Sequence, residues 1–149
     1  MGSDSQNIKE KGMYEYRVKV VKIIDGDTVD VDIDLGFGVW LKKERIRLFG
    51  IDTPESRTRD LDEKKYGLMA KDFITGLLSD EGGIVLKTHQ DAEGKYGRIL
   101  GELWRTTDLA DQSINEYMIE KHHAVSYHGQ SKDDIAEQHI INRGLVSSL

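Results

Sequence analysis

Apolar and polar residues alternate through much of the first fifty positions, a pattern typical of β-strands. Residues 14–24 are rich in Val, Ile and Tyr and favour a strand. Asp25-Gly26 is a hairpin signal, and in residues 29–35 Val29, Val31, Ile33 and Leu35 alternate with Asp30, Asp32 and Asp34. Gly36-Phe37-Gly38 turns the chain again, and residues 39–51 have the pattern of a third strand. We therefore expect a three-stranded antiparallel meander whose aspartates form a solvated face rather than a second metal site.

Beyond residue 60 the spacing of apolar positions changes to that of a helix. Residues 64–78 carry apolar side chains three and four apart, and the expected buried face is Leu68 or Met69, Phe73 and Leu77. Gly82-Gly83 is expected to stop this helix. Residues 84–87 and 98–105 have the composition of two further strands, joined by a polar loop.

Two more helices are predicted in the last third of the chain. Ser113 and Glu116 form a capping box, which opens a helix with Ile114 and Met118 on one face. Residues 133–143 favour another helix, with Gly144 as its stop. Five strands with a helix after the third is the element order of a small Greek-key barrel. The sequence thus predicts an α+β protein, a five-stranded barrel of the oligonucleotide-binding (OB) type with three helices.

Length and composition narrow the class of protein. The 149 residues suggest one domain, which we expect at 13–149, after a disordered segment or cloning remnant at 1–12. The absence of cysteine excludes a disulfide scaffold, thiol catalysis and cysteine-ligated zinc. The sequence has no 18-residue apolar run, so we expect no membrane-spanning helix. Residues 1–12 are polar and lack the apolar core of a signal peptide. We therefore expect a soluble protein, secreted if a leader was trimmed and otherwise intracellular.

The net charge of −6 argues against a general phosphate-neutralising surface. The excess acid is unevenly placed, however, because residues 101–149 hold 8 acidic and 4 basic side chains, a difference of −4. The first hundred residues are nearly neutral, so an anion-binding site is expected there.

Two short acidic segments are candidates for binding a hard cation. Asp27 lies in the turn Asp25-Gly26-Asp27-Thr28, where its carboxylate is either an exposed turn group or a ligand for Ca²⁺ or Mg²⁺. Asp52, Thr53 and Glu55 surround the chain's only proline, Pro54, which holds Thr53 extended and fixes the direction of its carbonyl. This segment is either a polar turn or a second group of ligands, with Glu55 left to act on a water.

Two cationic segments also allow either a structural or a phosphate-binding interpretation. Arg47 lies five residues before Asp52, so strict alternation places the two on opposite faces unless the strand bulges or ends at Gly50. Otherwise Arg47 is a solvated strand residue paired with a neighbouring acid. The segment Lys95-Tyr96-Gly97-Arg98 is an ordinary loop or a phosphate-binding one, with Arg98 offering two parallel hydrogen bonds.

Taken together, these motifs resemble the staphylococcal-nuclease-like, or thermonuclease, family. Five segments carry the resemblance in order: Asp25 to Val29, Arg47 to Glu55, Tyr66-Gly-x-x-Ala70, Lys95 to Arg98, and Asn115-Glu116. It covers roughly residues 14–127, and its order and spacing are specific although each segment alone is weak.

The resemblance implies a calcium-dependent phosphodiesterase, and we expect one that acts on DNA and RNA as a monomer. It implies that Ca²⁺ is bound by the carboxylates of Asp27 and Asp52 and by the carbonyl of Thr53. It implies that Glu55 orients or deprotonates the attacking water, and that Arg47 and Arg98 clamp the phosphate. The side chains that would contact the rest of the substrate are Lys95, Tyr96 and Tyr127.

This chain departs from the family pattern in two respects. Secreted members studied as nucleases are basic, and a second substrate-side tyrosine is replaced by Gly129, where His128 could stack on a base instead. A non-catalytic nucleic-acid or protein-binding barrel is the alternative function, although such relatives lose the acids and arginines retained here. The five histidines are expected to be solvated polar residues rather than a zinc site: His89, His122, His123, His128 and His139.

Overall fold

The computed structural model describes residues 14–79, 82–89, 98–107 and 111–147. Its strands are β1 (Glu15–Asp25), β2 (Thr28–Gly36), β3 (Val39–Leu48), β4 (Ile51–Asp52), β5 (Ile84–His89), β6 (Ile99–Arg105) and β7 (Val125–Ser126). Its helices are α2 (Leu61–Leu78), α3 (Ile114–Glu120) and α4 (Lys132–Ser147). No helix in these ranges is both long and apolar enough to cross a membrane.

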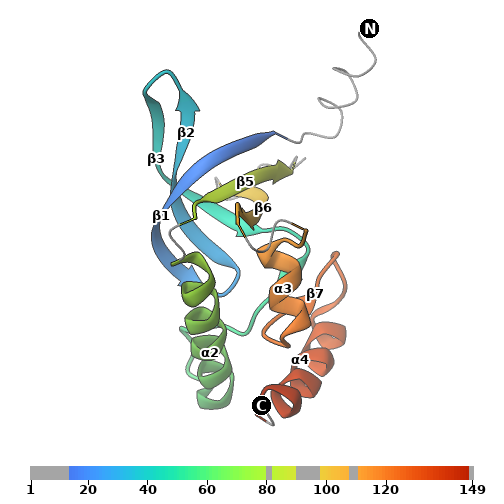
Figure 1. Ribbon diagram of the computed structural model, residues 1–149. Coiled ribbons are helices and arrows are strands. Elements are labelled where there is room, and N and C mark those ends of the chain that lie inside the picture. Colours follow the sequence, from blue (N-terminus) through green and yellow to red (C-terminus); the bar gives the residue numbers. More distant parts are fainter. Residues whose placement is uncertain (1–13, 80–81, 90–97, 108–110, 148–149) are drawn as a thin grey trace, which may run out of the picture.

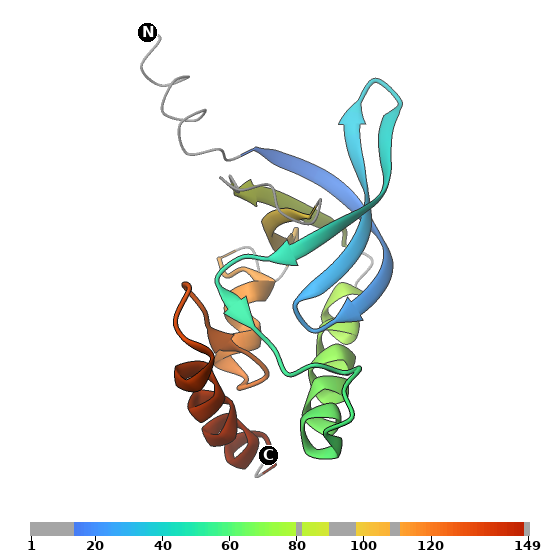
Figure 2. The ribbon, with the colours of Figure 1, turned by 180° about the vertical axis from the view of Figure 1, so that it is seen from behind.

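Five strands close into a barrel in the order β1-β2-β3-β6-β5. The meander β1-β2-β3 is antiparallel, and the barrel closes through a parallel pairing of β3 with β6 and an antiparallel pairing of β1 with β5. The three helices lie together at one end of the barrel, and the β2–β3 hairpin projects from the other (Figure 1). The view from behind shows the same division (Figure 2). The predicted five-stranded barrel with three helices is confirmed.

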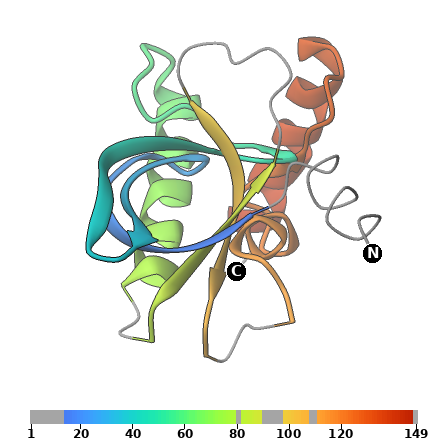
Figure 3. The same ribbon diagram turned by 90° about the horizontal axis from the view of Figure 1, so that it is seen from above.

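Alternation along the strands places their apolar side chains inside the barrel. Val29, Val31 and Ile33 are buried, as expected, and they pack with Ile46 and Leu86 in the core. Leu35 belongs to the same alternating set but is exposed. It lies where the β2–β3 hairpin has passed beyond the barrel, so no opposing layer covers it. Viewed from above, the strands wrap around the barrel interior (Figure 3).

The aspartates of β2 alternate with its buried residues, as predicted, but the Asp30 and Asp32 side chains are only 15% and 17% exposed, so the face is paired rather than solvated. Asp30 pairs with Arg45 Nε at 2.8 Å, and this hydrogen bond holds the pKa of the Asp30 carboxyl below its usual range. Asp32 accepts from the backbone N–H of Lys43 and pairs with Lys42. These carboxylates are satisfied by cations of the neighbouring strand β3.

Helix α2 differs from its prediction at its start and in its buried face. It begins at Leu61, three residues early, because the Asp60 side chain caps it by accepting from the backbone of residues 62 and 63. Leu77 is buried and Phe73 packs against the core, as predicted, but Leu68 is exposed. The other buried residues of the helix are Gly67, Ala70, Ile74 and Leu78. The helix face is set by close packing of its two small residues, which the spacing of large apolar residues does not reveal.

For the other two helices, the predicted start of α3 is confirmed and the predicted end of α4 is wrong. Ser113 Oγ accepts from the Glu116 backbone N–H at 3.0 Å, and Ile114 and Met118 are fully buried, so the predicted helix start at Ser113 is confirmed. The Glu116 side chain accepts from the Ser113 hydroxyl at 3.2 Å. Gly144 does not end α4, which continues to Ser147. Burial of Val146 in the last turn offsets the cost of a helical glycine, about 1 kcal/mol.

Candidate active site

Two turns meet below the barrel and build the site. The first joins β1 to β2 and carries Asp27, whose carboxylate is buried and accepts from Thr28 Oγ1 at 2.9 Å and from the Thr53 backbone N–H at 3.1 Å. Asp25, two residues earlier, accepts from both the backbone N–H and the hydroxyl of Ser56. The first turn is therefore fastened to residues 53–56 at both ends.

The second turn requires a break in the strand after Arg47. β3 ends at Leu48, and Gly50 has φ +80°, a left-handed conformation that favours glycine. The predicted strand 39–51 is thus two strands, and the short β4 pairs with β7, with Asp52 opposite Val125. This break turns the Asp52 side chain to the face that Arg47 occupies.

Arg47 lies between the two aspartates. Its Nη1 is 3.5 Å from Asp27 Oδ2, and its Nη2 is 3.5 Å from Asp52 Oδ1. The guanidinium also donates to the Leu48 carbonyl at 3.1 Å, and only 15% of the side chain is exposed. The alternative of a solvated Arg47 paired with a neighbouring acid on the sheet is wrong. The structure brings together Asp27, Arg47 and Asp52, which are predicted site residues from three different elements of the sequence.

The donor set at this point suits a hard dication. The Asp27 and Asp52 carboxylates converge on the Arg47 guanidinium, and buried Thr53, the residue after Asp52, has a hydroxyl Oγ1 with no hydrogen-bond partner. Oxygen donors are those that Ca²⁺ and Mg²⁺ prefer. Within the ranges that the structure describes, no three His, Asp or Glu side chains form a metal cluster. A cation here would therefore take main-chain or water oxygens besides the two carboxylates.

Glu55 follows on the same turn, and its side chain is exposed. Its backbone N–H donates to Glu63 Oε2 at 3.0 Å, which connects the turn to the first turn of α2. The path of the turn leaves no space beneath it, because a Cβ placed on Gly67 would lie 2.3 Å from the Glu55 carbonyl oxygen. A Cβ on Gly26 would lie 2.9 Å from Ala70 Cβ. The Tyr-Gly-x-x-Ala motif thus packs α2 against both turns.

The remaining predicted residues lie around this centre or outside the described ranges. Arg98 precedes β6, two residues before Leu100, which pairs with Arg47 across the parallel strands. Alternation in that register puts Arg98 on the face of Arg47. Tyr127 follows β7, and its backbone N–H donates to the Gly50 carbonyl at 2.8 Å. Lys95 and Tyr96 lie outside the residues that the structure describes.

Asn115, the first residue of the last motif, stabilises the break at Gly50 from the other side. Its side-chain amide donates to the carbonyls of Phe49 at 2.9 Å and Gly101 at 3.1 Å, and its Oδ1 accepts from the Leu103 N–H at 3.1 Å. Asn115 is buried. It therefore ties the end of β3 to β6 and α3.

Three histidines that were expected to be solvated are not. His123 stacks on Phe73, with ring centroids 4.5 Å apart. His89 stacks on Phe49, with ring centroids 3.9 Å apart, and bonds to Glu102. His139, on α4, has its Nε2 2.8 Å from Asp52 Oδ2, and only 12% of its side chain is exposed. His139 is the residue at the site that the sequence reasoning missed, because 87 positions separate it from its partner. His128 bonds to Ser126 Oγ at 3.0 Å, and stacking of its ring on a base stays a prediction.

Comparison with known proteins places this geometry in a family. A family model described as staphylococcal nuclease homologue matches residues 45–143. Protein ParB of Escherichia coli is 33% identical over 126 residues, covering 80% of this chain and 63% of its own. The thermonuclease of Staphylococcus hyicus is 30% identical over 100 residues, covering 67% of this chain and 55% of its own. Endonuclease YhcR of Bacillus subtilis is 27% identical over 118 residues, covering 76% of this chain and 9% of its own. The chain thus spans between about half and two thirds of the first two relatives and a small part of the third.

Proposed function

This chain belongs to the staphylococcal nuclease family, and from that membership and the site geometry we propose that it is a nuclease, hydrolysing phosphodiester bonds of DNA and RNA. The observation that carries the proposal is the convergence of Arg47 on Asp27 and Asp52, with Glu55 three residues further along the same turn. Two of the relatives are named as nucleases, which supports the same activity.

We propose that the acidic pair binds Ca²⁺. Asp27 and Asp52 would supply carboxylate oxygens and Thr53 its carbonyl, and the bound cation would place positive charge beside the phosphoryl oxygens and the attacking water. The partnerless hydroxyl of Thr53 and the pairing of both carboxylates with one cation support an oxygen-rich cation site.

The side chains of the site have complementary roles in in-line attack by water. Negative charge grows on the phosphoryl oxygens in the transition state, and Arg47 and Arg98 would stabilise it by charge-assisted hydrogen bonds. Glu55 would orient the water and accept its proton, a contribution of roughly 10²–10⁴-fold to the rate. Lys95, Tyr96 and Tyr127 would hold the neighbouring phosphate and nucleoside.

The test is digestion of single-stranded DNA and of RNA with Ca²⁺ or with excess chelator. Glu55→Gln keeps the size of the side chain but removes its basic oxygen, so we expect a folded protein with a rate lower by about 10²–10⁴-fold. Glu137→Gln, an exposed carboxylate on α4, is the matched control and should retain the wild-type rate. Full activity in chelator would exclude the cation, and wild-type turnover by Glu55→Gln would remove Glu55 from the reaction.

A non-catalytic binding barrel is the alternative function. The retention of Asp27, Arg47, Asp52, Glu55 and Arg98 favours the enzyme, because a binding module has no use for a carboxylate next to a phosphate clamp. Nucleic-acid binding with no cleavage under any metal condition would favour the binding module. That the domain spans 13–149, acts as a monomer and is soluble are further predictions, testable by limited proteolysis and size-exclusion chromatography.

A further inference from the structure

We propose that His139 is a positioning residue that fixes the Asp52 carboxylate in the orientation the cation needs. This inference rests on the proposed function, because it assigns a role within the same site. It concerns a side chain on α4, outside the two turns that carry the acids.

The contacts of Asp52 show how its carboxylate is held. Oδ2 lies 2.8 Å from His139 Nε2, and Oδ1 lies 3.5 Å from Arg47 Nη2. An ionised carboxylate only accepts hydrogen bonds, so the imidazole Nε2–H donates. With one donor on each oxygen, rotation of the carboxylate about its terminal bond would break at least one contact. The shorter of the two contacts is the one made by His139.

The His139 side chain is more protected from water than the Asp52 carboxylate to which it bonds. His139 is 12% exposed and Asp52 28% exposed. A hydrogen bond to an ionised group at such a site contributes more than one on an open surface, because water competes less for either group. His139 therefore has both the distance and the environment of a side chain that orients a ligand.

Helix α4 is held firmly enough to aim this imidazole. Asn142 Nδ2 donates to the Ala124 carbonyl at 3.1 Å, and both residues are buried. One turn after His139, the Arg143 guanidinium lies 5.5 Å from the centre of the Tyr66 ring on α2. Tyr66 Oη is also 2.9 Å from Ser147 Oγ. The helix is therefore fixed to α2 and to the segment before β7.

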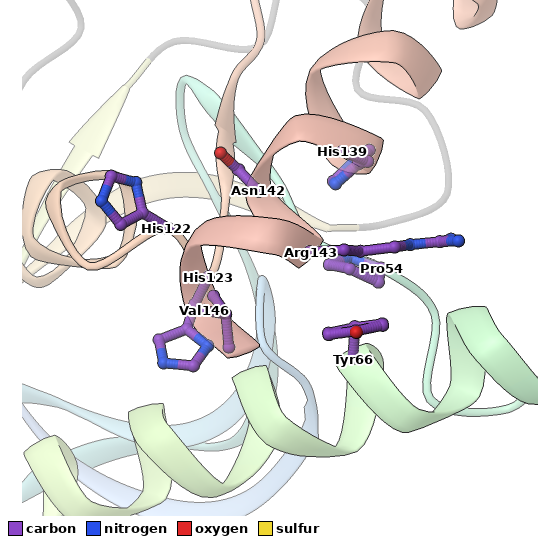
Figure 4. A pocket seen from close by; sticks show the side chains of 8 residues that line it. All are labelled: Pro54, Tyr66, His122, His123, His139, Asn142, Arg143 and Val146. Atoms are coloured by element: carbon purple, nitrogen blue, oxygen red, sulfur yellow. The ribbon is translucent and has the colours of Figure 1, made fainter. Parts of the chain in front are cut away.

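Figure 4 shows His139 and Arg143 on the same side of α4, with Arg143 beside Pro54 of the acidic turn. These side chains line a cavity of ≈ 10 Å³ between α4, α2 and the turn. That volume is about enough for one water molecule and for nothing larger. The arrangement supports the turn and is not itself a ligand site.

A direct role of His139 in binding the cation is the competing explanation. His139 Nε2 is already engaged by Asp52, and within the described ranges no three His, Asp or Glu side chains form a cluster. Imidazole also suits transition metals, whereas carboxylate and carbonyl oxygens suit Ca²⁺. The geometry favours a histidine that holds the ligand.

The experiment compares His139→Leu, which removes the donor, with His139→Gln, which restores an N–H donor. Gln138→Leu, an exposed polar residue one position earlier on α4, is the matched control. Binding of Ca²⁺ by calorimetry and of Tb³⁺ by luminescence is measured beside turnover. Loss of a hydrogen bond to a metal ligand typically lowers metal affinity or activity 10–100-fold. We expect a Ca²⁺ affinity about 10-fold weaker for His139→Leu, largely restored in His139→Gln and unchanged in Gln138→Leu.

A metal-free measurement separates this inference from the proposed function. In chelator, the unfolding midpoints of Asp52→Asn, His139→Leu and the double variant form a cycle, and contact between the two residues predicts non-additive shifts. Additive shifts, or wild-type Ca²⁺ affinity in His139→Leu, would overturn the positioning role. Loss of Mn²⁺ or Zn²⁺ binding with Ca²⁺ binding unchanged would also overturn it, in favour of direct ligation. If the wild type neither binds Ca²⁺ nor cleaves, the proposed function fails, while the cycle still decides whether His139 holds Asp52.

Discussion

Gly67 is the position where the smallest substitution should disturb the site most. A Cβ there would lie 2.3 Å from the Glu55 carbonyl oxygen, 2.4 Å from its carbonyl carbon and 2.6 Å from the Ser56 nitrogen. All three atoms belong to the backbone, so no side chain can rotate away. Ordinary contact begins at 3.4 Å, so the turn must move by about 1.1 Å (3.4 − 2.3) relative to α2.

The effects of Gly67→Ala on stability and on rate should differ in size. Alanine gains about 1 kcal/mol of helix propensity, and overpacking costs about 1–3 kcal/mol. The net loss of stability is therefore about 0–2 kcal/mol. A displacement of about 1 Å in a catalytic group, by contrast, lowers the rate by about 100-fold. We expect a folded variant whose nuclease rate falls far more than its stability.

Gly76→Ala is the matched control, because it lies on the same helix with no atom within 4 Å of its added Cβ. It should gain up to about 1 kcal/mol of stability and keep the wild-type rate. Urea denaturation gives the stabilities, and initial rates on single-stranded DNA give the activities. If Gly67→Ala cleaves as fast as the wild type, the packing of α2 does not position Glu55, and the reasoning from the Tyr-Gly-x-x-Ala motif is refuted.

Two further predictions concern stability. Asn115→Ala removes three hydrogen bonds at about 1 kcal/mol each, including the one that pairs the buried Leu103 N–H, so urea denaturation should show a loss of about 3 kcal/mol. Asn142→Ala, which removes one buried hydrogen bond, should cost clearly less, and equal losses would contradict the role of Asn115. Burial, and secondarily the charge of His122, lowers the pKa of His123, so the unfolded chain takes up protons first and stability should fall as the pH drops through about 6.5. His123→Phe, which keeps a ring against Phe73, should flatten that loss in thermal unfolding measured from pH 7.5 to 5, and an unchanged slope would exclude His123 as its source.

The strands of the barrel could be predicted because each carries its own signal. Val29, Val31 and Ile33 alternate with charged residues, and period two alone decides which face of β2 is buried. Apolar spacing predicted Leu77 on the buried face of α2, but not the close approach of the helix to the site through Gly67 and Ala70. Small residues indicate a close approach only once the partner is known, and the partners here are the turns at residues 26 and 55–56.

In the site, too, features set by local sequence could be predicted, whereas features set by packing could not. Local rules gave the break at Gly50, since Arg47 and Asp52 could share a face only if the strand ended between them. No local rule gives the bond from His139 to Asp52, because its existence depends on where α4 packs. The polar composition of α4 instead predicted a solvated His139, since a histidine on a polar helix is usually solvated.

The residues of the family motifs therefore meet two requirements, one for functional groups and one for close packing. The requirement for close packing explains the spacing of the motifs. In the proposed function the acids and arginines serve the chemistry, whereas Gly26, Gly67 and Ala70 let α2 and the two turns approach closely. The turn with Asp27 and the turn with Glu55 are bonded directly through the Thr53 N–H, and α2 packs against both so closely that an added Cβ on Gly67 or Gly26 would not fit. A chain that kept every acid and arginine but carried larger side chains at these three positions would retain the functional groups and lose their arrangement. For that reason the retention of both sets in one sequence is a stronger argument for a working site than the retention of the acids alone.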